Sequence, residues 1–220
     1  DQTYFDQIDT EDKAYFLGLL YADGTNKIKT RTVTISLIDE EILLKFNSYL
    51  KSNKPLSFLD YNSKNKKYKN QYRIDIHSKR ITEKLNEFGC VPNKTFVLEF
   101  PNEKVLSKDL IRHFIRGYYD GDGGLYSYTP KAKPNSFRMA AHITSTPMFI
   151  SKMDEIIKKE LGIKTCVYIK DSRINCPRVF KINSHRDCIK FLDWLYKDAT
   201  IFLKRKHDKY LKILSTIEER

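Results

Sequence analysis

The sequence predicts an α+β protein made of two related halves, and three observations lead to this prediction. First, the segment YFLGLLYADG at 15–24 returns as FIRGYYDGDG at 114–123, an offset of about 100 residues. Second, each copy precedes a polar stretch typical of a strand and then an amphipathic helix. Third, a further strand and helix follow in both halves. We therefore expect two pseudo-symmetric αββαββα units, each with a mostly antiparallel sheet.

The downstream segments have the same order in the two halves. The expected strand–helix pairs are 32–36 with a helix from Asp39, 72–78 with 81–88, 141–145 with a helix from Thr146, and 179–184 with 188–196. Pro92 and Pro101 fall between the halves, where we expect a connector without regular structure. The predicted domains are thus 1–92 and 108–220, joined by a connector at 93–107.

The composition indicates a polyanionic partner. The 220 residues include 40 Lys and Arg against 28 Asp and Glu, a net charge of +12, and the sequence pI is about 9.4. An A/T-rich genome, in which lysine codons accumulate, is the alternative explanation. The chain begins with Asp1 rather than methionine, so natural residues before it are expected to be missing.

Neither a membrane nor an oxidising compartment is expected. No apolar run approaches the ~20 residues that span a bilayer, and the polar start is unlike a signal peptide. The four cysteines contain no C-x-x-C pair, so they predict buried thiols rather than a zinc site or a disulfide framework. We expect an intracellular protein, in the cytoplasm, the nucleoid or an organelle matrix.

The repeated segments predict two helices with defined ends. Thr10 and Ser107 are good N-cap residues, and acidic residues follow each of them in the first turn. Gly24 and Gly123 come at the other ends, where glycine often takes the left-handed conformation.

Small residues predict that these two helices touch. Glycine or alanine recurs four positions apart in each helix, which places both residues on one face. These residues are Gly18 and Ala22 in the first helix, and Gly117 and Gly121 in the second. Absent side chains allow close approach of two backbones, as in small-xxx-small helix pairs. Parallel packing on these faces brings Asp23 and Asp122 together.

Two facing carboxylates at the C-terminal ends of two helices are electrostatically unfavourable, because helix C-termini prefer cations. Divalent cations relieve this repulsion, and hard oxygen ligands suit Mg²⁺. Two Asp ligands with free metal positions on a basic surface are typical of metal-assisted phosphodiester hydrolysis.

The two copies resemble the nine-residue signature of the LAGLIDADG homing endonucleases, and the resemblance covers essentially the whole chain. It implies a β-saddle that grips consecutive major grooves of double-stranded DNA, with the motif helices packed at the interface. It also implies that Asp23 and Asp122 bind metal, together with the main-chain carbonyls of Ala22 and Gly121. Mg²⁺ is the expected cofactor; Mn²⁺ is expected to substitute, and Ca²⁺ to support binding without efficient cleavage.

The copies depart from the family pattern at several positions. The sixth motif position is Asp120 in the second copy but Tyr21 in the first, and the family uses this position structurally. Phe16 opens the first copy, and Arg116 and Tyr118 stand where small or aliphatic residues are commoner. These differences affect local packing rather than metal binding.

The resemblance implies further catalytic residues. Family members place a lysine near each active site, and aligning the ends of the halves gives Lys94 and Lys206. A lysine there polarises the scissile phosphate or orients the attacking water; a solvated surface lysine is the alternative. Ser36 and Ser145, at the ends of the central strands, are expected to position water.

Alternation along 68–77 predicts a DNA-binding face. Tyr72, Ile74 and Ile76 should face the core, while basic and polar residues between them face outward and can read base edges. Segments 27–31, 131–138, 164–173 and 178–181 are interpreted as comparable basic strands, although each alone could be an ordinary solvated face. The residues expected to contact DNA are Lys27, Lys29, Arg31, Lys67, Lys69, Gln71, Arg73, Asp75, His77, Lys131, Lys133, Arg138, Lys170, Arg173, Arg178 and Lys181.

The sequence therefore predicts a monomeric, site-specific endonuclease without an obligate protein partner. The resemblance implies cleavage across the minor groove of a long asymmetric site, with 3′ overhangs, and an association with an intron or intein. An intron maturase or another non-cleaving nucleic-acid-binding protein on the same scaffold is the alternative. Serine-hydrolase and Walker-type enzymes are excluded, because neither G-x-S-x-G nor G-x-x-x-x-G-K-[ST] occurs.

Overall fold

The computed structural model describes residues 1–129, 131, 137–169 and 177–218. The first half contains α1 (Glu11–Asp23), β1 (Thr25–Lys27), the 3₁₀ turn η1 (Ile28–Thr30), β2 (Thr32–Leu37), α2 (Glu40–Tyr49), β3 (Ser57–Leu59), β4 (Gln71–His77) and α3 (Lys79–Glu87). The connector contains the 3₁₀ turns η2 (Lys94–Phe96) and η3 (Lys108–Leu110). The second half contains α4 (Ile111–Asp122), β5 (Gly123–Tyr128), β6 (Arg138–Ser145), α5 (Pro147–Leu161), β7 (Cys166–Ile169), β8 (Arg178–Ile182), α6 (His185–Tyr196) and α7 (Lys204–Glu218).

The two halves have the same sheet topology. The strand orders are β1-β2-β4-β3 and β5-β6-β8-β7, and every pairing is antiparallel. The predicted α+β fold with two αββαββα units is confirmed. The helix α7 is an addition to the second unit.

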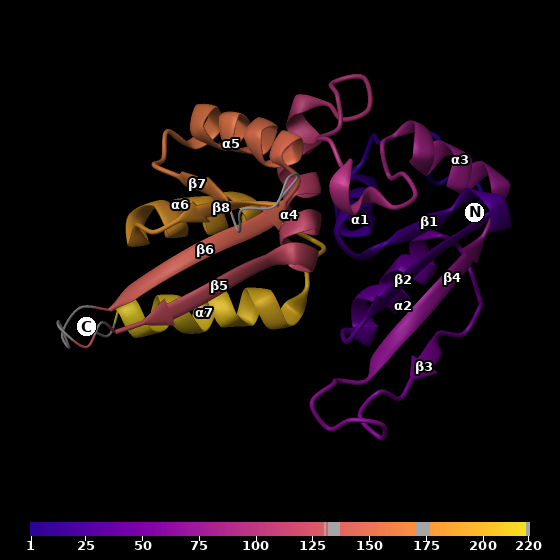
Figure 1. Cartoon of the computed structure of the whole chain (residues 1–220), viewed down its shortest axis with the longest axis horizontal. Coiled ribbons are helices and arrows are strands. Elements are labelled where there is room, and N and C mark those ends of the chain that lie inside the picture. The colour runs from indigo at the N-terminus through magenta and orange to yellow at the C-terminus, as the bar shows by residue number, and fades with distance from the viewer. Residues whose placement is uncertain (130, 132–136, 170–176, 219–220) are drawn as a thin grey trace.

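Helices α1 and α4 lie side by side at the centre, with one sheet on either side (Figure 1). A Cβ atom at Gly18 would overlap the Phe114 carbonyl, and one at Gly117 would overlap the Tyr15 carbonyl. The backbones are therefore in direct contact, as the small-residue pattern predicted. Gly121 lies against Ala22, so the two C-terminal ends meet and the helices run in parallel.

The expectation of left-handed glycines at the helix ends was wrong. Gly24 and Gly123 have φ of −76° and −81°, in the extended region. The reason is that β1 and β5 start directly after α1 and α4, without a turn. Glycine is still required, because a Cβ atom would lie 2.6 Å from the Leu20 oxygen at Gly24 and 2.5 Å from the Tyr119 oxygen at Gly123.

The predicted N-caps were only partly right. Thr10 occupies the N-cap position of α1, but its side chain makes no capping hydrogen bond. Ser107 precedes the turn η3, so α4 begins later, at Ile111. Elsewhere Ser78, Thr146 and Ser184 cap α3, α5 and α6 with their hydroxyl groups.

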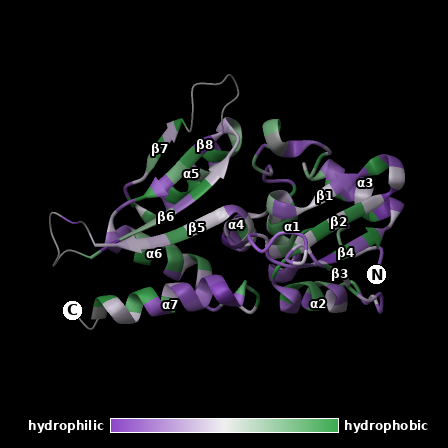
Figure 2. Ribbon diagram, turned by 60° about the horizontal axis from the view of Figure 1, so that its bottom comes forward, coloured by the Kyte–Doolittle hydropathy of each residue, from purple (hydrophilic) through white to green (hydrophobic). Residues whose placement is uncertain are grey.

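Each sheet buries one face under helices. Figure 2 shows α2 beneath the first sheet, and α6 and α7 beneath the second. Val33, Ile35 and Ile74 belong to the core on that side of the first sheet. Since strand side chains alternate, their neighbours along the chain point to the opposite face.

The cysteines differ in exposure. Cys90 and Cys188 are buried thiols, as expected, whereas Cys166 is exposed. The reason is that Cys166 belongs to β7, which ends the second sheet and pairs only with β8. Cys176 lies outside the described residues. In the described part of the chain, no helix is long and apolar enough to cross a membrane.

Candidate active site at the paired helix ends

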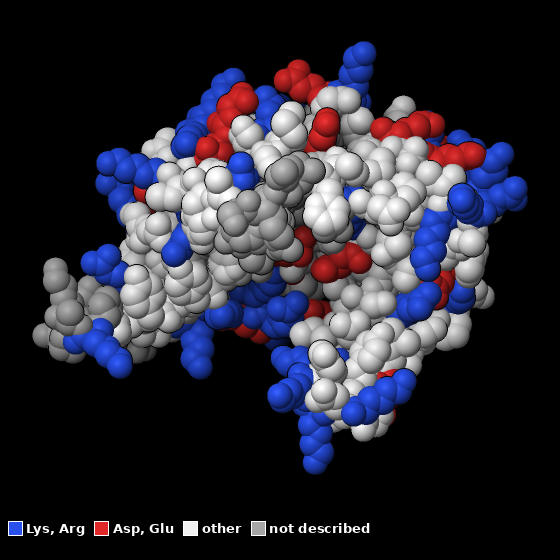
Figure 3. Space-filling model, viewed as in Figure 1, with Lys and Arg blue, Asp and Glu red and all other residues white. Residues whose placement is uncertain are grey.

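The C-terminal ends of α1 and α4 bring Asp23 and Asp122 together. The missing side chain of Gly121 leaves room for Asp23, since a Cβ atom there would lie 2.8 Å from the Asp23 Oδ2 atom. Both Asp residues are exposed, so solvent and a ligand can reach their carboxylates. Figure 3 shows acidic side chains in the hollow between the halves, with basic side chains gathered below it.

The two carboxylates resist ionisation. Surrounding protein atoms raise the pKa of Asp23 to about 6, and the negative charge of Asp122 adds to this shift. Partial desolvation by the surrounding protein atoms also raises the pKa of Asp122, although its side chain remains accessible to solvent. Lys94 and Lys206 oppose both shifts. The positive charge of Arg205 also opposes the shift of Asp23.

Lys94 and Lys206 occupy equivalent positions, as the aligned halves predicted. Lys94 Nζ donates to the carbonyl oxygens of Leu20, at 2.6 Å, and Gly24. Lys206 Nζ donates to the carbonyl oxygens of Tyr119, at 2.7 Å, and Gly123, at 2.6 Å. Each lysine therefore binds the last carbonyls of one motif helix, where the helix dipole favours a cation.

Both lysines are partly buried and bound to main-chain carbonyls, so they are not freely solvated surface residues. Burial lowers the pKa of Lys94, and it lowers the pKa of Lys206 to about 8. At neutral pH Lys206 is still mainly protonated, because its pKa remains above 7. The positive charge of Lys206 therefore stays beside the carboxylates.

Ser145 contributes to the second half of the site, but Ser36 has no matching role. The Tyr118 hydroxyl donates to the Asp122 carboxylate and accepts a hydrogen bond from the Ser145 hydroxyl, 2.8 Å away. These residues and Lys94 line a cavity of about 420 Å³. In the first half, Leu19 stands where Tyr118 would be, and it has no hydroxyl.

The sheet registers explain why the two serines differ. Thr25 pairs with Thr34, and the equivalent Gly124 pairs with His142. Ser36 lies two residues after Thr34, so its counterpart lies two residues after His142. That residue is Thr144, not Ser145. The predicted equivalence of Ser36 and Ser145 was therefore off by one residue, which places them on opposite sheet faces.

The sixth motif position has a structural role in both copies. Asp120 is fully buried and accepts hydrogen bonds from the Tyr15 hydroxyl (2.9 Å), the Tyr196 hydroxyl (2.8 Å) and the Leu203 amide (2.7 Å). The Tyr21 hydroxyl donates to the Phe88 carbonyl. Both side chains are therefore engaged in hydrogen bonds within the protein.

Sequence reasoning missed the role of Arg116. Its guanidinium is fully buried and forms an ion pair with Glu11 at 2.6 Å. It also donates to the carbonyls of Leu195 and Ile201. The arginine thus ties α4 to α1 and to the chain before α7. The sequence signal that could have indicated this role is an arginine at a motif position where small or aliphatic residues are commoner.

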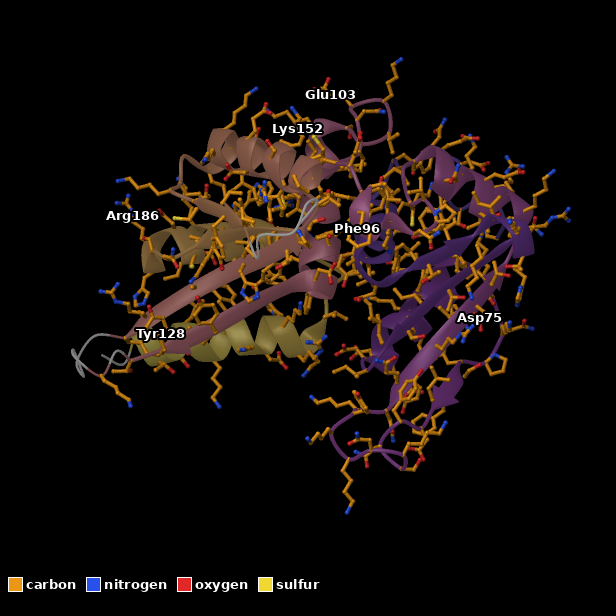
Figure 4. The ribbon with its side chains drawn as sticks, viewed as in Figure 1. Asp75, Phe96, Glu103, Tyr128, Lys152 and Arg186 are labelled. Carbon is orange, nitrogen blue, oxygen red and sulfur yellow. The ribbon has the colours of Figure 1, made fainter. Side chains whose placement is uncertain are left out.

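The outward face of the first sheet is polar. The predicted alternation is confirmed over β4, where Arg73 and Asp75 lie opposite the core and form a pair with N–O distances of 3.0 and 2.8 Å. Thr34, on the neighbouring β2, donates to the same Asp75 oxygen at 2.6 Å. Figure 4 labels Asp75 on β4.

Some expected DNA contacts in the first half lie outside strands. Lys67 and Lys69 belong to the loop before β4, which begins only at Gln71. Segment 27–31 is a strand end followed by η1, not a strand, because Arg31 turns the chain with a φ of 52°. Lys27, Lys29, Arg31, Gln71 and His77 are nevertheless at least partly exposed.

The outward face of the second sheet is more aromatic. Tyr126 and Tyr128 point away from the core residue Leu125 and stack with ring centroids 6.1 Å apart. Lys181 Nζ lies 5.2 Å from the Tyr126 ring centroid. Tyr168 shares this face, because it pairs with Val179 two residues from Lys181. These tyrosines were not predicted, although the alternation in 123–128 indicated them.

Not all expected contacts in the second half can lie on one face. Arg178 and Lys181 are three positions apart in β8, so they point to opposite sides of the sheet. Arg138 and Lys131 are exposed. Lys133, Lys170 and Arg173 lie outside the described residues.

Within the described residues, no group of three or more His, Cys, Asp or Glu side chains could hold a metal ion. Any metal here would be held by the two Asp carboxylates together with main-chain, solvent or ligand oxygens. Gly121 O lies 3.3 Å from Lys206 Nζ, so this expected ligand is shared with a lysine.

Solved structures share this fold. The LAGLIDADG homing endonuclease I-GzeII, in complex with its DNA target, is 13% identical with a TM-score of 0.60, covering 94% of this chain and 91% of that one. I-LtrWI, bound to target DNA, is 11% identical with a TM-score of 0.61 and coverage of 100% and 92%. Full-length DUF199/WhiA from Thermatoga maritima is 17% identical with a TM-score of 0.55 and coverage of 98% and 64%. The chain has the LAGLIDADG homing-endonuclease fold.

Similarity in sequence is more local. No family model matches the chain. The DNA-directed RNA polymerase subunit Rpo1C of Methanocaldococcus jannaschii is 32% identical over 114 residues, which are 52% of this chain and 13% of that protein. The replication factor C small subunit of the same organism is 25% identical over 153 residues, 68% of this chain and 8% of that protein. The chain therefore corresponds to only a small part of these relatives.

Proposed function

We propose that this protein is a site-specific, metal-dependent DNA endonuclease that cuts both strands across the minor groove and leaves 3′ overhangs. The observation that carries the proposal is the pairing of Asp23 and Asp122 at two helix ends, each end bound by a partly buried lysine. The DNA-bound endonucleases of the same fold support it. The predicted domains, 1–92 and 108–220, would each serve one strand.

The carboxylate pair fits a hard divalent cation. Among the described residues, no hydrogen-bond donor satisfies the Asp23 carboxylate, and the negative helix ends add to its charge. Asp23 and Asp122 would hold the metal, with the main-chain carbonyls of Ala22 and Gly121 as further oxygen ligands. Mg²⁺ or Mn²⁺ would supply Lewis-acid stabilisation of the charge that develops on the phosphate.

The remaining side chains prepare the site for a DNA backbone. Lys94 and Lys206 place positive charge beside the carboxylates, where it attracts and polarises the scissile phosphates. The Tyr118 hydroxyl, between Ser145 and Asp122, holds the Asp122 carboxylate in one orientation. Basic residues on the two sheet faces, such as Arg73 and Lys181, would contact the flanking major grooves.

The chain would act as a monomer on an asymmetric site. Both active-site halves are present in one chain, and their outward faces differ, so no palindrome is imposed. The sequence relatives suggest a mobile origin. Matches covering 52% and 68% of the chain must overlap, yet they belong to a polymerase subunit and a replication factor. A shared segment in two proteins of different function is typical of an inserted element, such as an intein.

Cleavage of a randomised plasmid library in Mg²⁺, followed by sequencing of the cut ends, tests the proposal. Asp23→Asn and Asp122→Asn remove one charge each without changing size, and Glu155→Gln on α5 is the matched control. We expect either active-site variant to cut both strands roughly a hundredfold or more slowly than the wild-type protein. Loss of a group that only orients a metal ligand costs about ten- to a hundredfold. Binding in Ca²⁺ should persist.

Wild-type cutting by either Asn variant would show that the paired carboxylates are not the metal site. Binding without cleavage by the wild-type protein would favour the alternative, a non-cleaving nucleic-acid-binding protein or maturase. The likeness to WhiA, which is not named as a nuclease, keeps that alternative open to test.

A further inference from the structure

The connector places an exposed phenylalanine in the same short turn as Lys94. Phe96 is the last residue of η2, and the first residue of that turn is the active-site Lys94. Its side chain is 65% exposed, and Figure 4 labels it near the junction of the two halves, close to α1. Single exposed apolar residues are common on protein surfaces, so what matters is how this one is held.

The turn that carries Phe96 is fastened to both halves. The amides of Val97 and Leu98 donate to the Lys94 carbonyl at 3.1 and 3.0 Å. On one side, Lys94 Nζ binds the end of α1. On the other, Leu98 is buried and its carbonyl accepts a hydrogen bond from the Thr146 hydroxyl of the second half. Phe96 is therefore presented from a turn whose two ends are both fixed at the active site.

The second half has no equivalent side chain. Lys206 corresponds to Lys94, and two positions further the chain has Asp208 where the first half has Phe96. Asp208 lies on α7 and pairs with Lys204 at 3.1 Å. A carboxylate cannot enter an apolar, electronegative environment such as a base stack. At the position equivalent to Phe96, the second half thus has a charged side chain in place of an apolar one.

We infer that Phe96 inserts into the minor groove at a base step next to the scissile phosphates and partly unstacks it. Proteins that bind the minor groove use apolar wedges in this way to bend the duplex. Phe96 would be a positioning residue that moves the backbone toward the carboxylates. Because pyrimidine–purine steps unstack most easily, it would also select such a step without hydrogen bonds to bases. This inference rests on the proposed function.

The test uses duplexes selected for binding to the full chain in Ca²⁺, with 2-aminopurine at each central position in turn. The wild-type protein should raise 2-aminopurine fluorescence at one step, and Phe96→Ala should abolish that rise while binding weakens tenfold or less. Phe96→Trp should restore it. The matched control is Leu44→Ala, which removes a 52% exposed side chain from α2 beneath the first sheet. Neither alanine variant removes a buried side chain, so both should fold.

Cleavage gives a second readout. In Mg²⁺, Phe96→Ala should cut an intact duplex ten- to a hundredfold more slowly, and a mismatch at the affected step should restore the rate because the step is already unstacked. Equal fluorescence with wild-type protein and Phe96→Ala, or no rise with bound wild-type protein, would overturn the inference. A fluorescence rise without any cleavage would support the insertion of Phe96 and would contradict the proposed endonuclease activity instead.

Discussion

The two halves of the molecule agree at the helix ends and differ around them. Asp23 and Asp122 occupy equivalent positions, and Lys94 and Lys206 bind equivalent carbonyls. The anchoring groups do not match: Tyr21 makes one hydrogen bond to a carbonyl, whereas the equivalent Asp120 accepts three. The small residues and the two Asp residues at the α1–α4 contact are alike in the two halves, while the side chains that anchor each helix differ.

The outward sheet faces differ in the same manner. The first presents Arg73, Asp75 and Thr34 in one hydrogen-bonded group. The second presents stacked tyrosines with Lys181 above Tyr126. Two sheets of identical topology therefore present surfaces of different chemistry.

The largest expected effect concerns the unequal anchors. Asp120→Ala leaves two tyrosine hydroxyls and one amide without their buried acceptor, and should lower the free energy of unfolding by about 3 kcal/mol or more. Tyr21→Phe removes one hydrogen bond and should cost about 1 kcal/mol. Urea unfolding monitored by circular dichroism measures both. Equal losses would show that the two halves are anchored alike.

Each of the two lysines should assist the cleavage of a different DNA strand. Lys94→Met and Lys206→Met each remove one ammonium group from one helix end. Each variant should therefore slow the cutting of one strand by roughly ten- to a hundredfold relative to the other strand, and the affected strand should differ between the two variants. A denaturing gel with the two strands separately labelled measures both rates. If both variants slowed the same strand, the assignment of one lysine to each half would be wrong.

The two faces should respond differently to loss of charge. Arg73→Ala should relax specificity at one base pair, with a cost of about 1–3 kcal/mol for the preferred base. Lys181→Ala should weaken all sequences alike and make the salt dependence shallower by about 0.9 in slope. Binding titrations at several salt concentrations with site variants distinguish these results. Unchanged preference in Arg73→Ala would remove this residue from base readout.

The smallest expected effect is a pH dependence that His113 contributes in the second half. Burial, and then the positive charge of Arg116, lower the pKa of His113 to about 4. The unfolded chain therefore binds the proton first, and stability should fall as pH decreases from about 6.5 toward 4. The loss should be about 1 kcal/mol by about pH 5.5. The first half has Ala14 at this position, so His113→Ala tests the comparison.

Urea unfolding at neutral pH and at about pH 5.5 gives the difference for each protein. The dependence should be smaller in His113→Ala than in the wild-type chain, because the titrating group is gone. An identical pH dependence in both would place the acid sensitivity elsewhere.

Much of the fold was predictable because it depends on short-range patterns. The repeat, the order of strands and helices, and the small faces of α1 and α4 are all written within a few residues of one another. The contact of Gly18 with Phe114 follows once both helices are recognised. The helix ends were predicted less well, because the conformation of Gly24 depends on the strand that follows it.

The sequence by itself determined that the chain is duplicated, that its elements come in the order αββαββα, and that Asp23 and Asp122 end the two central helices. Only the tertiary structure decided which serine reaches the site, that Arg116 is buried against Glu11, and that Phe96 is fixed beside the active-site Lys94. The reason is physical. Local propensity and periodicity act along the chain, whereas strand register and buried partners depend on residues that lie far apart in sequence and meet only in the folded protein.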